Sequence, residues 1–248
     1  MKGDNQVKIE IESENLINED VLGDIKDVLH FYQALGFESL PIRLAGSGRR
    51  TAAGKRLKVG TAEKDVLLAG LREEIGDCGR CKLSDKRTNI VFGEGSPGAR
   101  LMFIGEAPGR EEDRQARPFV GEAGRLLARL IEKMGFRRED VYIANIVKCR
   151  PPMNRDPEDD EIEECMKFLK RQIEIINPDV IMSLGRISAL TLIGNDKLKI
   201  SAIRGRFFDY EGIPLMPTFH PAYLMRNPRD KWLTWSDAQK VIERLQKG

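Results

Sequence analysis

From residue 100 onward, short apolar runs alternate with segments whose apolar residues recur at helical spacing, and no other feature restricts the fold of this 248-residue chain as strongly. The apolar runs predict strands buried on both faces, and the amphipathic segments predict the helices that cover them. We therefore expect an α/β fold, a three-layer α/β/α sandwich with a central, mainly parallel four-stranded sheet. The expected strands are 101–104, 141–147, 180–184 and 214–219, and the expected helices are 62–75, 122–134, 160–176, 187–193 and 236–246.

Each expected strand ends in a loop with glycine or polar residues. Residues 105–109 follow the first strand and residues 148–152 the second, while 185–186 and 220–224 follow the third and fourth. In parallel sheets, ligands bind at the carboxyl ends of the strands, where such loops meet. We therefore expect one crevice that collects side chains from all four loops.

The chain has four cysteines, Cys78, Cys81, Cys149 and Cys165, spaced as C-x₂-C, a gap of 67 residues and C-x₁₅-C. Four soft thiolates suit a tetrahedral Zn²⁺ site or an iron-sulfur cluster, and the spacing leaves both open. Taken alone, Cys165 is also explained as a small buried residue, because it lies on the apolar stripe of the expected helix 160–176. The tight pair and the Arg-Pro-Pro that follows Cys149 favour metal ligation by all four.

Composition and charge narrow the class of protein. No run approaches the roughly 18 apolar residues of a membrane span, and the first residues lack the apolar region of an export signal. We expect a cytoplasmic protein whose thiols stay reduced. Residues 1–40 carry a net charge of −6 and the remaining 208 carry +8, which is compatible with a polyanionic partner without requiring one.

Two parts are expected along the chain, an N-terminal extension at 1–60 and a functional domain at 61–248. In the extension, apolar residues at helical spacing predict a short helix that stops at Gly36. Residues 43–58 contain six basic residues, three glycines and no acid, which is typical of a flexible linker. This linker is either a solvated tether or a DNA-binding arm.

Four side chains near the expected crevice depart from the local pattern. Glu106 lies just past a strand, between glycine and alanine, where a side chain faces the crevice. Phe119 lies outside any amphipathic period, so it is either a core residue or a stacking platform for a flat ligand. Asn145 interrupts an apolar strand and needs partners, from the backbone or from a base edge. His220 is either structural or a group that stabilises negative charge on a leaving group.

Four stretches closely resemble the uracil-DNA glycosylase superfamily, and specifically its family 4 iron-sulfur members. They are GEAPGREED at 105–113, RPFVGEAG at 117–124, YIANIVKCRPP at 142–152 and HPAYLMRNP at 220–228, with all four cysteines in step. The resemblance covers residues 62–248 and leaves 1–60 uncovered. Family 5 relatives lack the Glu of the first motif, and the crosslinking variants carry an inserted basic loop that ends in histidine. This chain has Glu106 and no such loop.

The resemblance implies a monofunctional enzyme that flips deoxyuridine out of DNA and hydrolyses its N-glycosidic bond, which starts base excision repair. Phe119 matches the residue on which uracil stacks, and Asn145 matches the amide that reads its Watson–Crick edge. The pocket wall corresponds to Gly105, Glu106 and Ala107. His220 matches the donor to uracil O2, and Glu106 is expected to orient water or stabilise the cationic sugar, with Glu112 as a second candidate.

The resemblance also implies DNA contacts and a cofactor. Leu224 matches the side chain that wedges into the base stack, and Arg226 is expected to hold phosphate. The cysteines would hold one structural [4Fe–4S] cluster. The expected partner is uracil-containing DNA, single- or double-stranded, bound by a monomer whose extension docks a replication or repair protein. Two alternatives stay open: a glycosylase of broader specificity for deaminated bases, and a non-catalytic, metal-stabilised nucleic-acid-binding protein.

Overall fold

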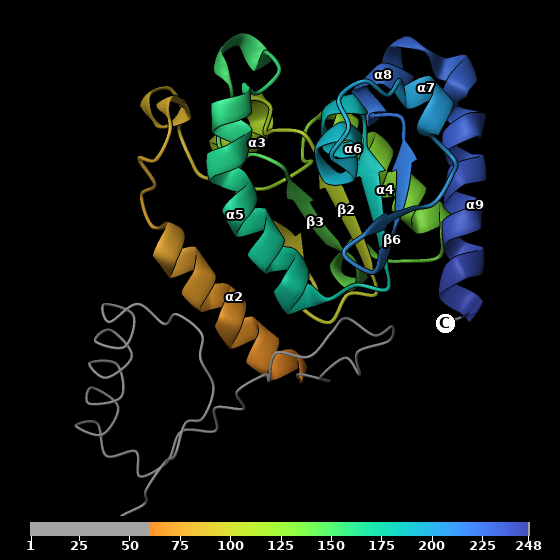
Figure 1. The fold of residues 1–248 in the computed structure, drawn as a ribbon, viewed down its shortest axis with the longest axis horizontal. Helices are drawn as coiled ribbons and strands as arrows, with labels where there is room; N and C mark the ends of the chain where they lie inside the picture. Colours follow the sequence, from red (N-terminus) through yellow and green to blue (C-terminus); the bar gives the residue numbers. More distant parts are fainter. Residues whose placement is uncertain (1–59, 248) are drawn as a thin grey trace, which may run out of the picture. The chain divides into compact units, whose positions relative to one another are not determined.

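The computed structural model describes residues 60–247, which form a sheet flanked by helices (Figure 1). The helices are α2 (Thr61–Ile75), α3 (Arg110–Gln115), α4 (Glu122–Lys133), α5 (Asp159–Ile176), α6 (Arg186–Ile193), α7 (Ile200–Ile203), α8 (Pro221–Arg226) and α9 (Lys231–Lys247), with 3₁₀ turns η1 (Lys82–Asp85), η2 (Arg138–Asp140), η3 (Pro152–Asn154) and η4 (Pro228–Asp230). The strands are β1 (Glu94–Gly95), β2 (Leu101–Gly105), β3 (Tyr142–Asn145), β4 (Val180–Leu184), β5 (Phe208–Tyr210) and β6 (Ile213–Thr218). The predicted short helix and basic linker fall on residues outside the described part.

The sheet has six strands in the order β1-β3-β2-β4-β6-β5. The four predicted strands are its parallel centre, with β2 paired to both β3 and β4, and β4 paired to β6. The prediction of four strands was wrong at the edges, where β1 and β5 add antiparallel to β3 and β6. These edge strands have only two and three residues, too few to produce an apolar run in the sequence.

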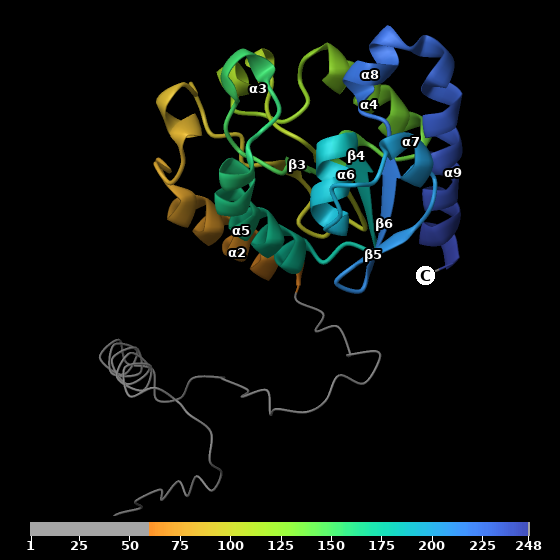
Figure 2. The ribbon, with the colours of Figure 1, turned by 45° about the horizontal axis from the view of Figure 1, so that its top comes forward.

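Helices cover both faces of the sheet because successive strand residues point to opposite sides. Met102, Ile104 and Ala144 face a core that α2 and α5 complete with Leu71 and Leu169. The residues between them on the strands form a second core with α4 and α9, whose members include Leu101, Phe103, Ile143, Leu127 and Val241. Figures 1 and 2 show α2 and α5 on one side of the strands and α9 on the other.

Local signals explain where the long helices begin and end. Glu158 and Glu161 form a capping box at the start of α5, and Asn177 closes this helix in a left-handed conformation. The expected helices at 62–75, 122–134, 160–176 and 187–193 each correspond to an observed one. The prediction of 236–246 was wrong at its start, because α9 begins at Lys231 and its first turn buries no apolar side chain.

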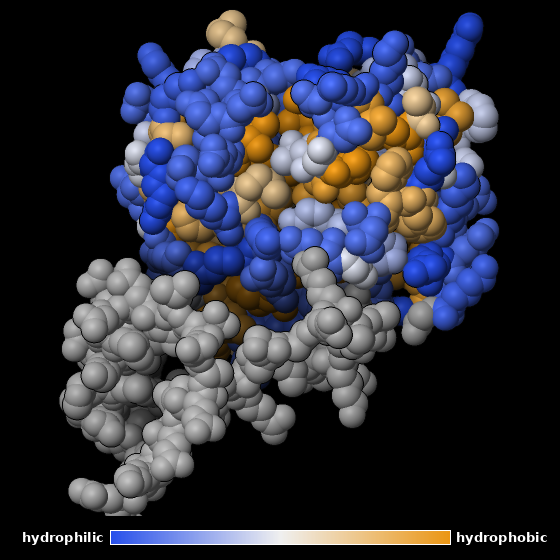
Figure 3. Space-filling view, in the orientation of Figure 1, coloured by the Kyte–Doolittle hydropathy of each residue, from blue (hydrophilic) through white to orange (hydrophobic). Residues whose placement is uncertain are grey.

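The hydropathy of the surface differs between helices α5 and α6. Figure 3 shows polar atoms over α5 and an apolar area over α6, the helix rich in isoleucine and leucine. Among the described residues, none of the helices combines the length and hydrophobicity that crossing a membrane requires.

Candidate active site and metal centre

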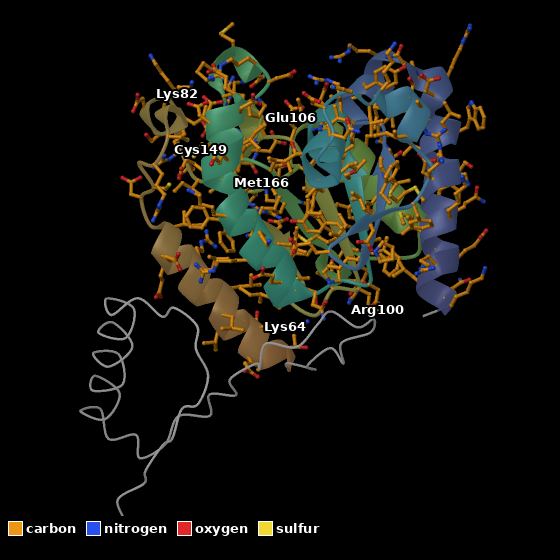
Figure 4. The ribbon with its side chains drawn as sticks, in the orientation of Figure 1. Lys64, Lys82, Arg100, Glu106, Cys149 and Met166 are labelled. Atoms are coloured by element: carbon orange, nitrogen blue, oxygen red, sulfur yellow. The ribbon has the colours of Figure 1, made fainter. Side chains whose placement is uncertain are left out.

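A cleft of about 420 Å³ opens at the carboxyl ends of the parallel strands. The loops after β2, β3 and β6 line it, and α8 contributes part of one wall. Figure 4 shows Glu106 at this end of the sheet, beside α5. Seven of the predicted site residues are in its lining, namely Glu106, Ala107, Glu112, Phe119, Asn145, His220 and Arg226.

Gly105 brings Phe119 and Asn145 together. It ends β2, and the parallel register pairs it with Asn145 of β3. A Cβ atom at Gly105 would lie 2.4 Å from Asn145 Oδ1 and 2.5 Å from Phe119 Cζ, so only glycine lets both side chains pack here. Asn145 is 1% exposed, and its Oδ1 has no hydrogen-bond partner among the described residues. A buried acceptor of this kind costs about 1–3 kcal/mol until an N–H donor reaches it.

Phe119 lies on a loop that Glu112 holds in place. The backbone φ of Phe119 is 50°, a left-handed value that aromatic residues rarely adopt. Glu112 Oε1 accepts hydrogen bonds from the backbone N–H groups of Val120 at 2.9 Å and Gly121 at 2.8 Å. This role has no signature in the sequence, because the partners lie eight and nine residues along the chain. Glu112 therefore holds the loop that carries Phe119.

His220 faces the cleft from the N-terminus of α8. Its Nδ1 accepts a hydrogen bond from the backbone N–H of Ala222 at 3.1 Å, so the neutral ring carries its proton on Nε2. Burial lowers the pKa of His220 to about 4, with Glu112 opposing and Arg226 reinforcing the shift. Its ring centroid lies 5.8 Å from that of Phe119. At neutral pH, His220 is therefore an uncharged hydrogen-bond donor.

Glu106 is a carboxyl group in the cleft lining whose pKa lies well above the usual value of a glutamate. The pKa of Glu106 is raised to about 7, mainly by burial and also by nearby Asp156, while Arg186 lowers it. Asp156 and Arg186 form an ion pair at 2.5 Å. The loop after β4 thus influences the cleft through the charge of Arg186 rather than as part of its lining. A carboxyl group with this pKa exchanges a proton readily at neutral pH.

Leu224 of helix α8 is buried in this structure. The Leu224 side chain is 3% exposed and lines a separate apolar cavity of about 160 Å³ between α4, α8 and α9. Packing of α8 against α4 thus buries Leu224 in this structure, and its role as a wedge in DNA stays a prediction. The exposed residues of this helix turn are Met225 and Arg226.

The four cysteines line one cavity beside α5, and none forms a disulfide (Figure 4 labels Cys149). Within residues 60–247, no three His, Cys, Asp or Glu side chains are grouped closely enough to hold a single metal ion. Three sulfurs have hydrogen-bond donors: Arg80 Nη1 at 3.2 Å from Cys78 Sγ, the Lys148 N–H at 3.2 Å from Cys165 Sγ, and Arg87 Nη1 at 3.7 Å from Cys149 Sγ. Donors of this kind stabilise the thiolates that ligate iron-sulfur clusters.

A buried lysine that sequence reasoning missed joins the cysteine cavity to the cleft. Lys148 is 1% exposed, and its Nζ donates to the backbone carbonyl of Asn145 at 2.9 Å and to Gln172 Oε1 at 2.6 Å. Gln172 in turn donates to the carbonyl of Phe92 at 2.9 Å. The available signal was a lysine directly after an apolar strand, where a charged residue has to find buried partners.

Comparison with known proteins gives consistent results. The profile of the uracil DNA glycosylase superfamily matches residues 92–246. The type-4 uracil-DNA glycosylase of Thermotoga maritima is 48% identical over 165 residues, which are 66% of this chain and 86% of the relative. That of Sulfurisphaera tokodaii is 45% identical over 184 residues, 71% of this chain and 84% of the relative. A type-5 uracil-DNA glycosylase of Pyrobaculum aerophilum is 28% identical over 151 residues, 54% of this chain and 66% of the relative.

Proposed function

Because the chain belongs to the uracil-DNA glycosylase superfamily, and within it to the type-4 enzymes, we propose that it excises uracil from DNA in the cleft described above. The base would be flipped out of the DNA, since the bond between uracil N1 and sugar C1′ cannot be reached inside the stack. Hydrolysis would release uracil and leave an abasic sugar as the first step of base excision repair. The observation that supports this best is the unpaired Oδ1 of Asn145 beside the ring of Phe119.

Asn145 and Phe119 would select the base. The Oδ1 atom of Asn145 would accept from uracil N3–H, and its NH₂ group would donate to uracil O4. Cytosine presents an acceptor at N3 and a donor at N4, so both contacts would be mispaired and the buried amide would stay unsatisfied. Phe119 would stack on the base, on a loop that Glu112 fixes. Backbone at Gly105, Glu106 and Ala107 would form the wall beside it.

Glu106 and His220 would carry the chemistry. As the C1′–N1 bond breaks, its electron pair goes to uracil and positive charge builds on the sugar. His220 would donate from Nε2 to uracil O2 as negative charge develops there. The ring is neutral at pH 7, because the pKa of His220 is about 4, and a neutral ring with its proton on Nε2 is sufficient for this hydrogen bond. Glu106, ionised above about pH 7, would stabilise the cationic sugar and orient the water that adds to C1′. The water loses its proton to this carboxylate or to solvent.

The four cysteines would hold one [4Fe–4S] cluster. All four line one cavity, and ligation by four thiolates suits such a cluster. The cluster would pin the segments around Cys78 and Cys149 to α5, and hydrolysis needs no electron transfer. Arg80 and Arg87 would offset its thiolate charge.

DNA would approach the mouth of the cleft. Arg226 is exposed on α8 and lines the cleft, so it is suited to a phosphate next to the flipped nucleotide. The DNA would be bound by a monomer, and residues 1–60 would be available to a replication or repair protein.

A uracil-release assay tests this function. The protein is incubated with end-labelled oligonucleotides that contain one uracil opposite guanine, opposite adenine or in a single strand, and abasic sites are cleaved with alkali. We expect cleavage of uracil-containing strands and none of matched thymine or cytosine strands. A His220→Ala variant purified in parallel controls for host glycosylase. Retention of DNA without release would instead identify a non-catalytic binder, and equal release of hypoxanthine would identify a broader glycosylase.

A further inference from the structure

Met153 is the most exposed large hydrophobic residue of the described part of the chain, at 93%. Single exposed apolar residues are common on protein surfaces and need no function by themselves. Met153 differs by its place, since the residues on either side of it in the loop, Pro151, Asn154 and Arg155, line the cleft. Its side chain therefore stands at the rim of the site where DNA would lie.

The backbone presents Met153 outward in an unusual conformation. Met153 and Asn154 have φ values of 55° and 54°, in the left-handed region. Asparagine tolerates this region and methionine rarely adopts it, so the local sequence preference does not explain the turn. Side-chain hydrogen bonds between neighbouring segments hold it: Arg150 Nε donates to Asn154 Oδ1 at 2.8 Å, and Arg155 donates to both oxygens of the fully buried Glu161 at 2.8 and 2.6 Å.

The loop is also tied to the rigid parts of the fold. It starts two residues after Cys149, one of the four cysteines of the metal centre, and it leads through the capping box of α5 into that helix. The N–H groups of Asn154 and Arg155 donate to the carbonyls of Pro151 at 3.0 Å and Pro152 at 3.1 Å, which closes the turn. An apolar tip that is fixed in this way loses little conformational entropy when it inserts into a partner.

Charge at the same rim suits a polyanion. Arg150 precedes Met153 by three residues and Arg226 lines the cleft from α8, whereas Arg155 is already paired with Glu158 and Glu161. Figures 1 and 2 show the segment that leads into α5 and helix α8 at the same end of the sheet. Proteins that kink or open a duplex combine cationic phosphate contacts with an apolar side chain inserted between base steps. The burial of Leu224 leaves that apolar role unfilled by the residue the sequence suggested.

We propose that Met153 is the apolar wedge that enters the base stack of duplex DNA beside the flipped nucleotide. This inference rests on the proposed function, since the wedge only matters if a base is extruded into the cleft. The wedge would occupy space that the base leaves and so slow its return. Its contribution should be largest where unpairing is hardest, opposite adenine, smaller at a mismatch with guanine, and absent in a single strand.

The test compares Met153→Gly, Met153→Leu and wild type on three substrates, with kcat/KM for uracil release from U:A duplex, U:G duplex and single-stranded DNA. Glycine adopts φ near 55° without strain, so Met153→Gly should keep the fold. We expect it to lower kcat/KM about tenfold on U:A and about threefold on U:G, with single-stranded activity unchanged. Met153→Leu should stay near wild type on all three substrates, because it keeps an apolar side chain.

Val66→Ala is the matched control, because Val66 is an exposed apolar residue of α2 and is absent from the cleft lining. It should match wild type on every substrate. Equal duplex rates for Met153→Gly and wild type would overturn the wedge, and so would an equal loss on duplex and single strand. If wild type releases no uracil from any substrate, the proposed function fails and the wedge fails with it. Intact single-stranded activity therefore separates the two failures.

Discussion

Replacing Gly105 with alanine should damage base recognition by displacing two side chains at once. The new Cβ would lie 2.4 Å from Asn145 Oδ1 and 2.5 Å from Phe119 Cζ. Carbon atoms make favourable contacts at about 3.5 Å, so each group has to move by about 1 Å. Gly105 has no left-handed φ, and alanine therefore meets no backbone obstacle there. The perturbation is confined to the place where Asn145 and Phe119 meet.

The size of the effect follows from the displacement. A misplacement of about 1 Å in a reacting geometry costs on the order of 100-fold in rate. Overpacking of a buried site costs about 1–3 kcal/mol, against a typical folding stability of about 5–15 kcal/mol. We therefore expect Gly105→Ala to fold with a lowered Tm and to release uracil with kcat/KM reduced about 100-fold.

Single-turnover uracil release and thermal unfolding measure the two quantities separately. Gly98→Ala is the control, because its Cβ would meet the side chain of Thr61 at 3.2 Å, and neither residue lines the cleft. This control should lose no activity. If Gly105→Ala keeps its circular dichroism spectrum and a kcat/KM within threefold of wild type, the assignment of Asn145 and Phe119 as the base-reading pair is refuted.

Three further predictions address the other parts of the site. The rate of uracil release should fall about tenfold per pH unit below pH 7, because protonation removes the Glu106 carboxylate, whose pKa is raised to about 7. The Glu106→Gln variant should be slower and its rate should not depend on pH in this range. Protonation of His220 should cause no further loss of rate above pH 5, because its pKa is about 4. Asn145→Asp should impair uracil release by at least tenfold and relax the selection against cytosine; unchanged uracil kinetics would remove Asn145 from base reading. Cys149→Ala should lose visible absorption and lower the Tm together, whereas a fully loaded and stable variant would exclude Cys149 as a ligand.

The centre of the fold was predictable because its signal is local. Strands buried on both faces read as continuous apolar runs, so the four parallel strands appear within two residues of their observed ends. The edge strands β1 and β5 contain three polar or charged side chains among five residues, Glu94, Asp209 and Tyr210, and their strand character comes from hydrogen bonds to β3 and β6. Pairing between distant segments leaves no periodicity in a strand this short.

Some features of the candidate site were predictable from the sequence and others were not. Convergence of Glu106, Asn145 and His220 followed from topology, because each lies at the end of a parallel strand. The burial of Leu224 was not predictable, since HPAYLMRNP reads as a polar loop until α8 packs against α4. The partners of Glu112 were equally hidden, because a carboxylate at the start of a helix is explained by the helix dipole alone.

If the cysteines hold a cluster and Asn145 reads the base, as proposed, Lys148 links base choice to the metal that the protein acquires. Its backbone N–H donates to Cys165 Sγ, and its ammonium group holds the carbonyl of Asn145. A Zn²⁺ ion in place of a cluster would draw the sulfurs to about 2.3 Å from one centre and pull this residue with them. The amide of Asn145, which is proposed to distinguish uracil from cytosine, would then shift. Mis-metallation would thus produce a folded enzyme with altered selectivity, an error that a measurement of stability does not detect.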